Sequence, residues 1–241
     1  MVNVSAEVVK DLAADGVLRA SINLGNPVLA QGTPEEPTGV TVDIAREIAA
    51  RLGVSLELIC FDAARKSFEA MTSGRADICF LAIDHAREAE VAFTAPYVVI
   101  EGVYAVPVDS PLTTVDEVDA EGIRIGVKRG SAYDLYLSRT LQHATVVQGE
   151  EGTTAFREGA LEAAAGIRQP ITDYVAANPD LRVIQDRFMQ IQQAVGTPKS
   201  RTPETLHFLH TLIEDLKSSG FIANSLARSH RPVATVAPPA E

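Results

Sequence analysis

The stretch 42–61, VDIAREIAARLGVSLELICF, decides the fold class of this chain. Its first part places Ile44, Ile48 and Leu52 at helical spacing and stops at Gly53, which predicts an amphipathic helix. The second part, 56–61, is a short apolar run that predicts a strand. A helix followed at once by a strand is the repeating step of α/β proteins, so this stretch favours that class.

The same alternation continues on both sides of this stretch. A strand is predicted at 18–24, where apolar and polar residues alternate, and a helix at 64–72 and a strand at 77–82 follow further along. The Pro- and Gly-rich segment 26–39 is predicted as a loop. This βαβαβ order predicts a mostly parallel sheet with helices on both faces, and the predicted fold class is α/β.

A second unit with the same rhythm follows an extended run. The predicted elements are that run at 98–106, strands at 124–130 and 145–149, a helix at 131–141, a helix or strand at 160–167, and a strand from 181 to about 188 that resumes afterwards. Two similar units in tandem predict two lobes. Beyond them, Leu206, Leu209, Ile213 and Leu216 predict a helix before Gly220, and a second short helix follows. The tail 231–241 has no periodicity and is expected to be mobile.

The charge balance restricts the class of partner. The 241 residues include 21 basic and 32 acidic side chains, a formal net charge of −11. A duplex nucleic acid or an anionic membrane surface requires a basic face, so neither is an expected partner. No run approaches the roughly 20 apolar residues that span a bilayer, and no membrane insertion is predicted. A small solute remains compatible, because it meets only the local field of its pocket.

The sequence shows neither a signal that fixes the protein's compartment nor a pattern of metal ligands. Residues 1–16 lack the basic start and apolar core of a secretory signal, so the protein is cytoplasmic if Met1 is the natural start and periplasmic if a signal was removed. Cys60 and Cys79 lie in predicted strands that flank a third, about 9.5 Å apart, beyond the roughly 7 Å limit of a disulfide. Two buried thiols are expected. With five scattered His, no metal site and no cofactor are predicted.

Six blocks of sequence stand in a characteristic order. They are GVLRASI (16–22), GVTVDIAREIAARLG (39–53), FEAMTSGRADICF (68–80), REAEVAFTAPYV (87–98), IRIGVKRGSAYDLYL (123–137) and LIEDLKSSGFIANSLAR (212–228). Together they resemble the type II periplasmic solute-binding proteins of family 3, the cluster that serves polar amino-acid transporters. Each block alone is a weak signal, but their order and spacing make a strong one, and the likeness covers nearly the whole chain.

The resemblance implies a two-lobed fold, each lobe a mostly parallel sheet flanked by helices, joined by a two-strand hinge. Lobe one is then discontinuous, 1–102 and 190–241, and lobe two is 103–189. The crossings are expected near 100–103 and 189–192. A ligand would be held between the lobes and buried by hinge closure.

Arg87 occupies the position at which the family clamps a ligand carboxylate. A guanidinium matches a carboxylate with two parallel hydrogen bonds, so the implied role suits the residue. The alternative is a surface arginine paired with Glu90 or Asp84.

Ser131 is the second implied contact, at the start of a predicted helix. The N–H groups and dipole of such a helix end favour an anion, and Ala132 adds a further backbone N–H. The resemblance implies that this turn meets the same carboxylate as Arg87. Alternatively, Ser131 only caps the helix, and the neighbouring Tyr133 either lines the cleft or packs inside lobe two.

Two departures from the amino-acid-binding pattern bear on the substrate. Phe80 and Ala82 stand where family members carry serines, and Arg168 and Gln169 stand near the place of the aspartate that holds an α-ammonium group. A guanidinium offers no acceptor and repels a cation. If Arg87 and Arg168 both face the cleft, they suit a ligand with two anionic ends, such as a dicarboxylate. The alternative is that Arg168 is a solvated loop residue.

Uncharged side chains complete the predicted ligand set. Asn23, Asn26 and Gln31 follow the first strand, where the family's ligand-lining loop lies, and suit hydroxyl or carbonyl groups. Turn formation alone would also explain Asn26. Gln192 and Gln193, by the return crossing, serve either ligand contact or hinge packing.

The predicted function is the substrate-binding component of an ABC-type transporter, with a small anionic or zwitterionic solute and the transporter's membrane subunits as partners. One alternative is a cytoplasmic ligand sensor on the same fold, or a receptor domain of a membrane protein. Another is a dehydratase-like enzyme that uses Asp84, Glu101 or Glu162 as general acid. No GxSxG, GxGxxG, P-loop or HExxH motif supports catalysis.

Overall fold

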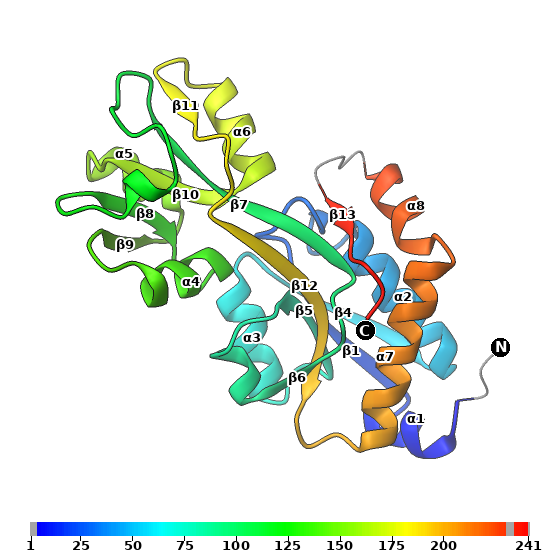
Figure 1. The fold of residues 1–241 in the computed structure, drawn as a ribbon. Helices are drawn as coiled ribbons and strands as arrows, with labels where there is room; N and C mark the ends of the chain where they lie inside the picture. The colour runs from blue at the N-terminus through cyan, green and yellow to red at the C-terminus, as the bar shows by residue number, and fades with distance from the viewer. Residues whose placement is uncertain (1–3, 230–233, 241) are drawn as a thin grey trace. The chain divides into compact units, whose positions relative to one another are not determined.

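The computed structural model describes residues 4–229 and 234–240, in two compact units (Figure 1). Unit 1 contains the chain up to Val99 and again from Gln192, and unit 2 is Ile100–Ile191. The chain passes between the units twice, in strands β7 (Val98–Pro107) and β12 (Met189–Pro198). The crossings expected near 100–103 and 189–192 fall in these two strands.

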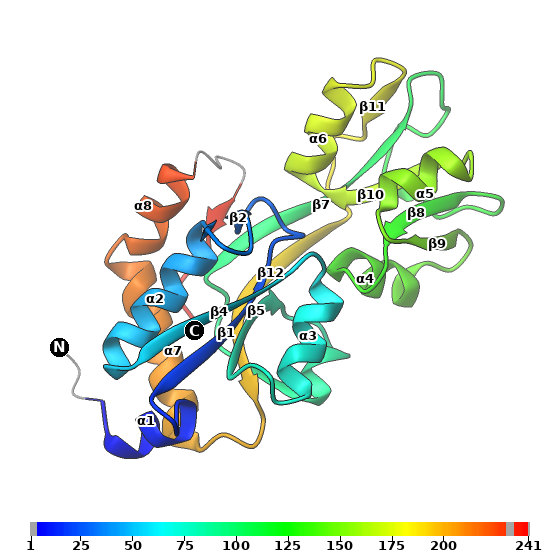
Figure 2. The ribbon, with the colours of Figure 1, turned by 180° about the vertical axis from the view of Figure 1, so that it is seen from behind.

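Unit 1 is built on a sheet with the order β4-β1-β5-β12. Strands β4, β1 and β5 are parallel, whereas β12 runs antiparallel to β5. Helix α3 lies on one side of this sheet, and α2, α7 and α8 lie on the other (Figure 2). The elements of unit 1 other than the crossing strands are α1 (Ala6–Leu12), β1 (Val17–Asn23), β2 (Gln31–Gly32), β3 (Pro37–Thr38), α2 (Val40–Leu52), β4 (Ser55–Phe61), α3 (Ala64–Thr72), β5 (Ile78–Ala82), η1 (Arg87–Ala89), β6 (Val91–Phe93), α7 (Pro203–Ser218), α8 (Phe221–Arg228) and β13 (Thr235–Val236).

Glycines fix both ends of α2, the helix predicted first. Gly39 precedes it with a φ of 105°, and a Cβ there would lie 2.5 Å from the carbonyl oxygen of Leu29. Gly53 ends it in the left-handed conformation, and its N–H donates to the carbonyls of Ala49 and Ala50. The helix buries one face, including Ile44, on the sheet, as its spacing predicts.

Unit 2 repeats the design with the order β7-β10-β8-β9. Strand β8 is parallel to both β9 and β10, while β7 is antiparallel to β10 and carries β11 on its far end. The elements of unit 2 other than the crossing strands are η2 (Asp116–Val118), β8 (Arg124–Lys128), α4 (Ala132–Thr140), β9 (Thr145–Gly149), α5 (Gly152–Glu158), β10 (Ala163–Ile167), α6 (Arg168–Ala176) and β11 (Leu181–Val183).

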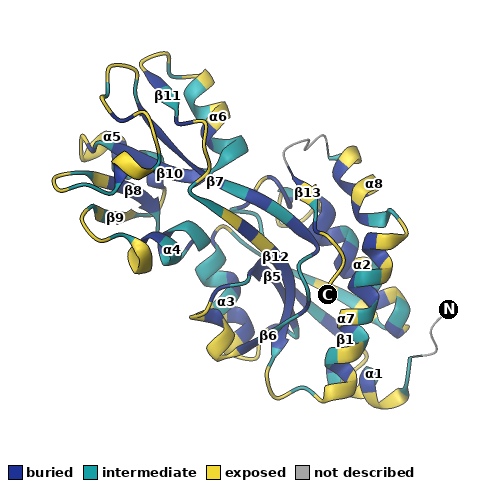
Figure 3. Cartoon of the chain, in the orientation of Figure 1, coloured by how far each residue is buried: buried dark blue, intermediate teal, exposed yellow. Residues whose placement is uncertain are grey.

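Both faces of the unit 2 sheet are covered, so the central strand β10 (AAAGI) is apolar and buried from Ala163 to Gly166 (Figure 3). Along β10, Ala163 and Ala165 pack with Leu137 of α4 on one face, and Ala164 packs with Phe156 of α5 on the other. The α/β fold class, with sheets flanked by helices, is therefore confirmed.

The structure corrects four details of the sequence prediction. The strand predicted from 181 to about 188 ends at Val183, and the open choice at 160–167 resolves to strand β10 with two unpredicted helices, α5 and α6, on either side. Cys60 is half-buried rather than buried, because β4 is an edge strand; Cys79 is buried, and both thiols are free.

The C-terminal segment is the fourth correction. It was expected to be mobile, but β13 pairs with Val98 and Val99 of β7, and Ala234 and Ala237 are buried. Backbone pairing and burial of small residues do not require hydrophobic periodicity, so the sequence pattern gave no sign of them. Residues 231–233 of that predicted tail lie outside the described part of the chain. Among residues 4–229 and 234–240, no helix has the length and apolar content to span a membrane.

Candidate functional site

The predicted ligand residues of unit 1 gather where its parallel strands end. Because β1, β4 and β5 are parallel, their carboxyl ends, at Asn23, Phe61 and Ala82, lie at one edge of the sheet. The loops that leave this edge carry Asn26 and Arg87. In open α/β sheets ligands bind outside the carboxyl ends of the strands.

Arg87 begins the short helix η1 just beyond β5, and only 3% of it is exposed. One guanidinium nitrogen, Nη1, donates to the carbonyl oxygen of Ala82 at 3.0 Å. Burial lowers the pKa of Arg87, and the negative charge of Asp84 opposes that shift. Asp84 also accepts a hydrogen bond from the N–H of Ala86 at 2.9 Å, so it shapes the turn that leads to Arg87. The guanidinium is thus a buried, oriented cation at the strand edge.

Phe80 and Ala82 are both buried in strand β5. The Phe80 ring meets Tyr97 edge to face, with the ring centroids 6.3 Å apart, so it belongs to the packed interior. Ala82 contributes its carbonyl oxygen to Arg87, as given above. Phe80 therefore supports the site by packing, and Ala82 supports it through its backbone carbonyl. Neither side chain carries a hydroxyl group that could bind a ligand.

The amide side chains after β1 stabilise their own loop. The Oδ1 of Asn23 accepts from the N–H of Gly25 at 3.0 Å, and the Oδ1 of Asn26 accepts from Val28 at 3.3 Å. Gln31 donates from Nε2 to the carbonyl oxygen of Pro27 at 2.7 Å. These contacts satisfy the turn-forming alternative for Asn26, which is buried.

By the return crossing, Gln193 is buried and its carbonyl oxygen accepts from Tyr97, whereas Gln192 is exposed and its carbonyl oxygen accepts from Ile83. The backbone carbonyls of both glutamines therefore attach β12 to unit 1. This agrees with the alternative that Gln192 and Gln193 serve hinge packing.

Unit 2 presents a matching edge. Strands β8, β9 and β10 are parallel and end at Lys128, Gly149 and Ile167, and each leads towards the N-terminus of a helix, α4, α5 or α6. Ser131 caps α4, and Arg168 and Gln169 are the first residues of α6. The predicted residues of this unit therefore lie at its own carboxyl edge.

The turn before α4 is held by a buried carboxylate. Ser131 accepts from the N–H of Asp134 at 3.1 Å, and Asp134, 1% exposed, accepts in return from the N–H of Gly130 at 2.7 Å. Gln148, near the end of β9, donates to both carboxylate oxygens of Asp134, at 3.0 and 2.9 Å. The amides of Ala132 and Tyr133 donate to no group in the described ranges 4–229 and 234–240, so they are available to an anion.

Of the alternatives for Tyr133, the structure has the side chain packed on the core of unit 2, and this burial raises its pKa. The capping role of Ser131 is confirmed, which leaves ligand contact as an additional, separate prediction.

Arg168 is neither alone nor loosely solvated. Its Nε donates to Glu101 at 2.6 Å and its Nη2 donates to the carbonyl oxygen of Gln185 at 2.9 Å. Glu101, on β7, also accepts from Arg187 at 3.0 Å. Burial acts to raise the pKa of Glu101, but the two arginines outweigh it and the pKa is lowered. Gln169 donates to Asp173 at 2.8 Å within α6.

Among the residues of these clusters that the sequence prediction did not name are Asp134 and Arg187. Asp134 follows the capping serine by three residues, and that spacing is the known signature of a reciprocal cap, so a local signal existed. Arg187 has no such signal, because its partner Glu101 lies 86 positions away.

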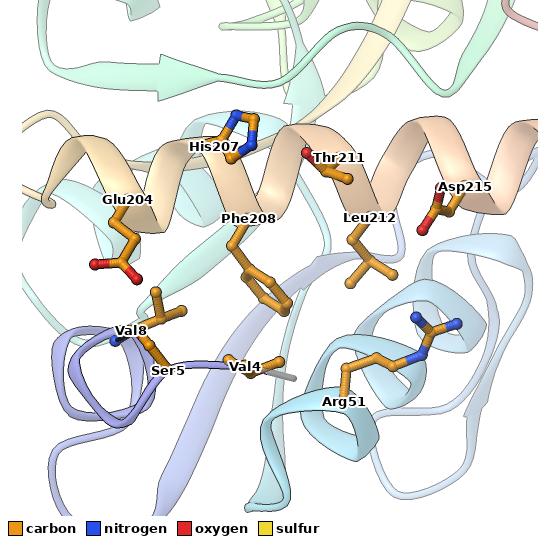
Figure 4. A pocket seen from close by; sticks show the side chains of 10 residues that line it. All are labelled: Val4, Ser5, Val8, Arg51, Glu204, His207, Phe208, Thr211, Leu212 and Asp215. Carbon is orange, nitrogen blue, oxygen red and sulfur yellow. Dashed lines mark hydrogen bonds between the residues drawn. The ribbon is translucent and has the colours of Figure 1, made fainter. Parts of the chain in front are cut away.

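A surface cavity of about 150 Å³ lies in unit 1, away from every predicted residue (Figure 4). The lining side chains come from α1, α2 and α7 and from the residues before α1; they are Val4, Ser5, Val8, Arg51, Glu204, His207, Phe208, Thr211, Leu212 and Asp215. The lining includes the apolar side chains of Val4, Val8, Phe208 and Leu212 and charged side chains of both signs. In the described ranges no cluster of three or more His, Cys, Asp or Glu side chains is arranged to hold a metal ion.

Residues 22–229 match the family model of bacterial extracellular solute-binding proteins, family 3. The chain belongs to this family. The family membership predicted from the six sequence blocks is confirmed. This family 3 protein also shares its fold with solved structures of solute-binding proteins.

Two solved structures illustrate the shared fold of this family 3 protein. The P235GK mutant of ArgBP from T. maritima has a TM-score of 0.75 at 22% identity, covering 92% of this chain and 99% of that one. The ancestral amino acid-binding protein AncCDT-1, described as a precursor of cyclohexadienyl dehydratase, has a TM-score of 0.73 at 20% identity, covering 91% and 98%. At these identities the likeness establishes the fold alone.

A curated relative of similar sequence is a sensor protein. The virulence sensor protein BvgS of Bordetella pertussis is 28% identical over 137 residues, which is 56% of this chain and 11% of BvgS. The family 3 protein therefore corresponds to a small part of that sensor's length.

Proposed function

We propose that this family 3 protein is the substrate-binding component of an ABC-type transporter. It would capture a small carboxylate-bearing solute between its two lobes by hinge closure. The observation that carries the proposal is the buried guanidinium of Arg87 at the carboxyl edge of the unit 1 sheet. A cation kept out of water and oriented by a backbone carbonyl is a suitable clamp for a carboxylate, because both partners of the ion pair gain from the low local dielectric.

The α4 turn supplies a complementary contact in the proposal. The amides of Ala132 and Tyr133 have no acceptor in the described protein, and the dipole of α4 favours negative charge at that end. A carboxylate bound by Arg87 in one lobe and by these amides in the other would link the lobes, which gives ligand binding a reason to favour closure.

The charges already paired at these edges support a narrower proposal for the solute class. Arg168 is bound to Glu101, so we do not propose Arg168 as a second anchor for a dicarboxylate. The carboxylates of Asp134 and Glu101 are occupied by donors of their own unit, so neither is open to an α-ammonium group. Both observations favour an organic acid with one carboxylate and neutral polar groups, ahead of an amino acid or a dicarboxylate.

A sensor role is the second candidate, favoured by the match to part of BvgS. Its binding step is the same, so the two functions differ in the partner: transporter membrane subunits in the first case, a signalling chain in the second. Because the family is described as extracellular, we propose that the transporter component works outside the cytoplasm.

The candidate general acids give catalysis less support than binding has. Hydrogen bonds from Arg124 lower the pKa of Glu162, and the pKa of Glu101 is lowered as described above. A general acid needs the opposite shift.

The test is a thermal-shift screen of amino acids, dicarboxylates, keto acids and aromatic acids on the wild-type protein, Arg87→Ala and Arg87→Lys. Ligand binding stabilises the folded state by mass action, by about 2.7 kcal/mol at a hundred times Kd. We expect one acid class to raise the Tm of the wild type and neither variant to respond. Arg46→Ala, which removes an exposed arginine from α2, is the matched control and should respond like the wild type.

An unchanged shift in both Arg87 variants would rule out the clamp. Loss of cellular uptake of the identified acid on gene deletion would support the transporter role, and unchanged uptake would favour the sensor.

A further inference from the structure

The C-terminal strap, residues 234–240, is attached to the very strand that leaves unit 1. Thr235 pairs with Val99 and Val236 with Val98, in antiparallel register, and the N–H of Ala237 donates to the carbonyl oxygen of Tyr97 at 3.1 Å. The boundary between the two units comes next in the chain, between Val99 and Ile100. The strap is therefore a second neighbour of the first residues of β7, which also lies beside β12 in the sheet (Figure 1).

A buried lysine fastens the strap and the start of β7 together. Lys217 of α7 is 9% exposed, and its Nζ donates to the carbonyl oxygens of Pro96 at 3.3 Å and Pro238 at 2.8 Å. Glu214, one turn earlier, accepts from the N–H of Ala240 at 3.3 Å. The side chain of Lys217 thus holds both the strap and the segment before β7 to the same helix.

The chain is also held on the other side of the boundary. Glu101, the second residue of β7 inside unit 2, is bound by Arg168 and Arg187 of that unit. With Val99 paired to the strap and Glu101 paired to unit 2, Ile100 is the residue between two fixed points. Rotation of one unit against the other must then be taken up at a short, defined joint in β7.

We propose that the C-terminal strap is a conformational element coupled to ligand binding: docked, it confines the β7 joint to Ile100, and released, it removes one of the two strands beside Val98 and Val99 and loosens the joint. The inference rests on the proposed function in that it assumes a hinge. A confined joint limits the number of open conformations that closure must select from, so the docked strap raises ligand affinity. By thermodynamic reciprocity, the bound ligand must strengthen strap docking by the same factor.

The variant Ala237→Pro removes the one N–H that donates to Tyr97 and leaves the rest of the strap in sequence. Pro239→Ala, at an exposed position of the same segment, is the matched control. A chain ended after Ser229 removes the strap altogether. Circular dichroism verifies that each variant is folded.

The first measurement needs no ligand. Spin labels at the exposed positions Glu69 of α3 and Thr154 of α5, in a Cys60→Ser background, report the distance between the units. We expect the distance distribution to broaden in Ala237→Pro and in the truncated chain, and to stay unchanged in Pro239→Ala. Identical distributions in all four proteins would overturn the proposal, whatever the protein binds.

The second measurement uses the acid found in the thermal-shift screen. We expect Ala237→Pro to weaken its binding about fivefold, and saturating acid to slow amide exchange at 235–237 about fivefold in the wild type. If the wild type binds an acid through Arg87 but neither change occurs, the coupling is absent while the proposed function stands. If no acid binds, the proposed function fails and the distance measurement alone decides whether the strap restrains the joint.

Discussion

Arg168 carries its positive charge into an ion pair with Glu101, and this changes what the site offers a ligand. Read from the sequence, Arg168 was a candidate second anchor for a dicarboxylate or a loop residue in water. In the fold, Glu101 and the carbonyl of Gln185 take its donors, while Arg87 remains buried beside the strand edge. Arg87 donates to the carbonyl oxygen of Ala82 at the carboxyl edge of the unit 1 sheet, so we expect carboxylate binding to depend on Arg87.

The Glu101 cluster predicts a specific pH dependence. Its pKa is lower in the folded than in the unfolded protein because the arginines outweigh burial. The unfolded state therefore takes up protons first, and the stabilisation is complete above the unfolded pKa of about 4.3 and lost as the pH falls through the folded pKa.

We expect Glu101→Gln to flatten the loss of stability below about pH 4.5, measured as the urea midpoint across the acid range. Glu36→Gln, at an exposed position, is the control and should keep the wild-type slope. Equal slopes in Glu101→Gln and the wild type would show that the pair contributes nothing to acid stability.

Strand β8 and helix α5 approach each other through facing glycines, and no side chain lies between their backbones. A Cβ on Gly126 would lie 2.5 Å from the carbonyl oxygen of Gly152 and 2.9 Å from the nitrogen of Phe156. The sequence showed no helix at 152–158, because its seven residues are too few to establish a period. The close approach, a tertiary contact, explains why a helix this short is stable here.

Gly126→Ala should consequently lower the free energy of unfolding by at least about 2 kcal/mol, since only the backbone can move to relieve the contact. Urea unfolding provides the measurement. Gly122→Ala is the comparison in the same unit: it meets open space but has a φ of 82°, so about 1 kcal/mol is expected. A cost at Gly126 no larger than that at Gly122 would mean that α5 shifts freely.

The two units share a design in which parallel strands end beside loops and helix N-termini. In unit 1 that edge carries Arg87, and in unit 2 it carries the α4 turn with its two available amides. The chain crosses between the units in two strands, β7 and β12. Under the proposed function, a ligand that contacted both edges would favour closure by its differential contacts alone.

Solution scattering measures that consequence. We expect the radius of gyration of the wild type to fall when the acid identified in the screen saturates it, and Arg87→Ala to show no change at the same concentration. A wild-type radius that stays constant under proven saturation would indicate binding to one unit without closure.

The sequence by itself determined the α/β class, the helix at 42–53, the order of the three parallel strands of the first unit and the family, because hydrophobic periodicity and block order are local or linear properties. It also placed Arg87 and the Ser131 turn at strand ends. Only the tertiary structure decided which charges were compensated and which segments were held. The Arg168–Glu101 pair, the Asp134–Gln148 contact and the docking of the strap on β7 all join residues distant in the chain, where no periodic pattern records them. Their effect depends on which neighbour satisfies each donor and acceptor, and that is settled only when the chain is packed.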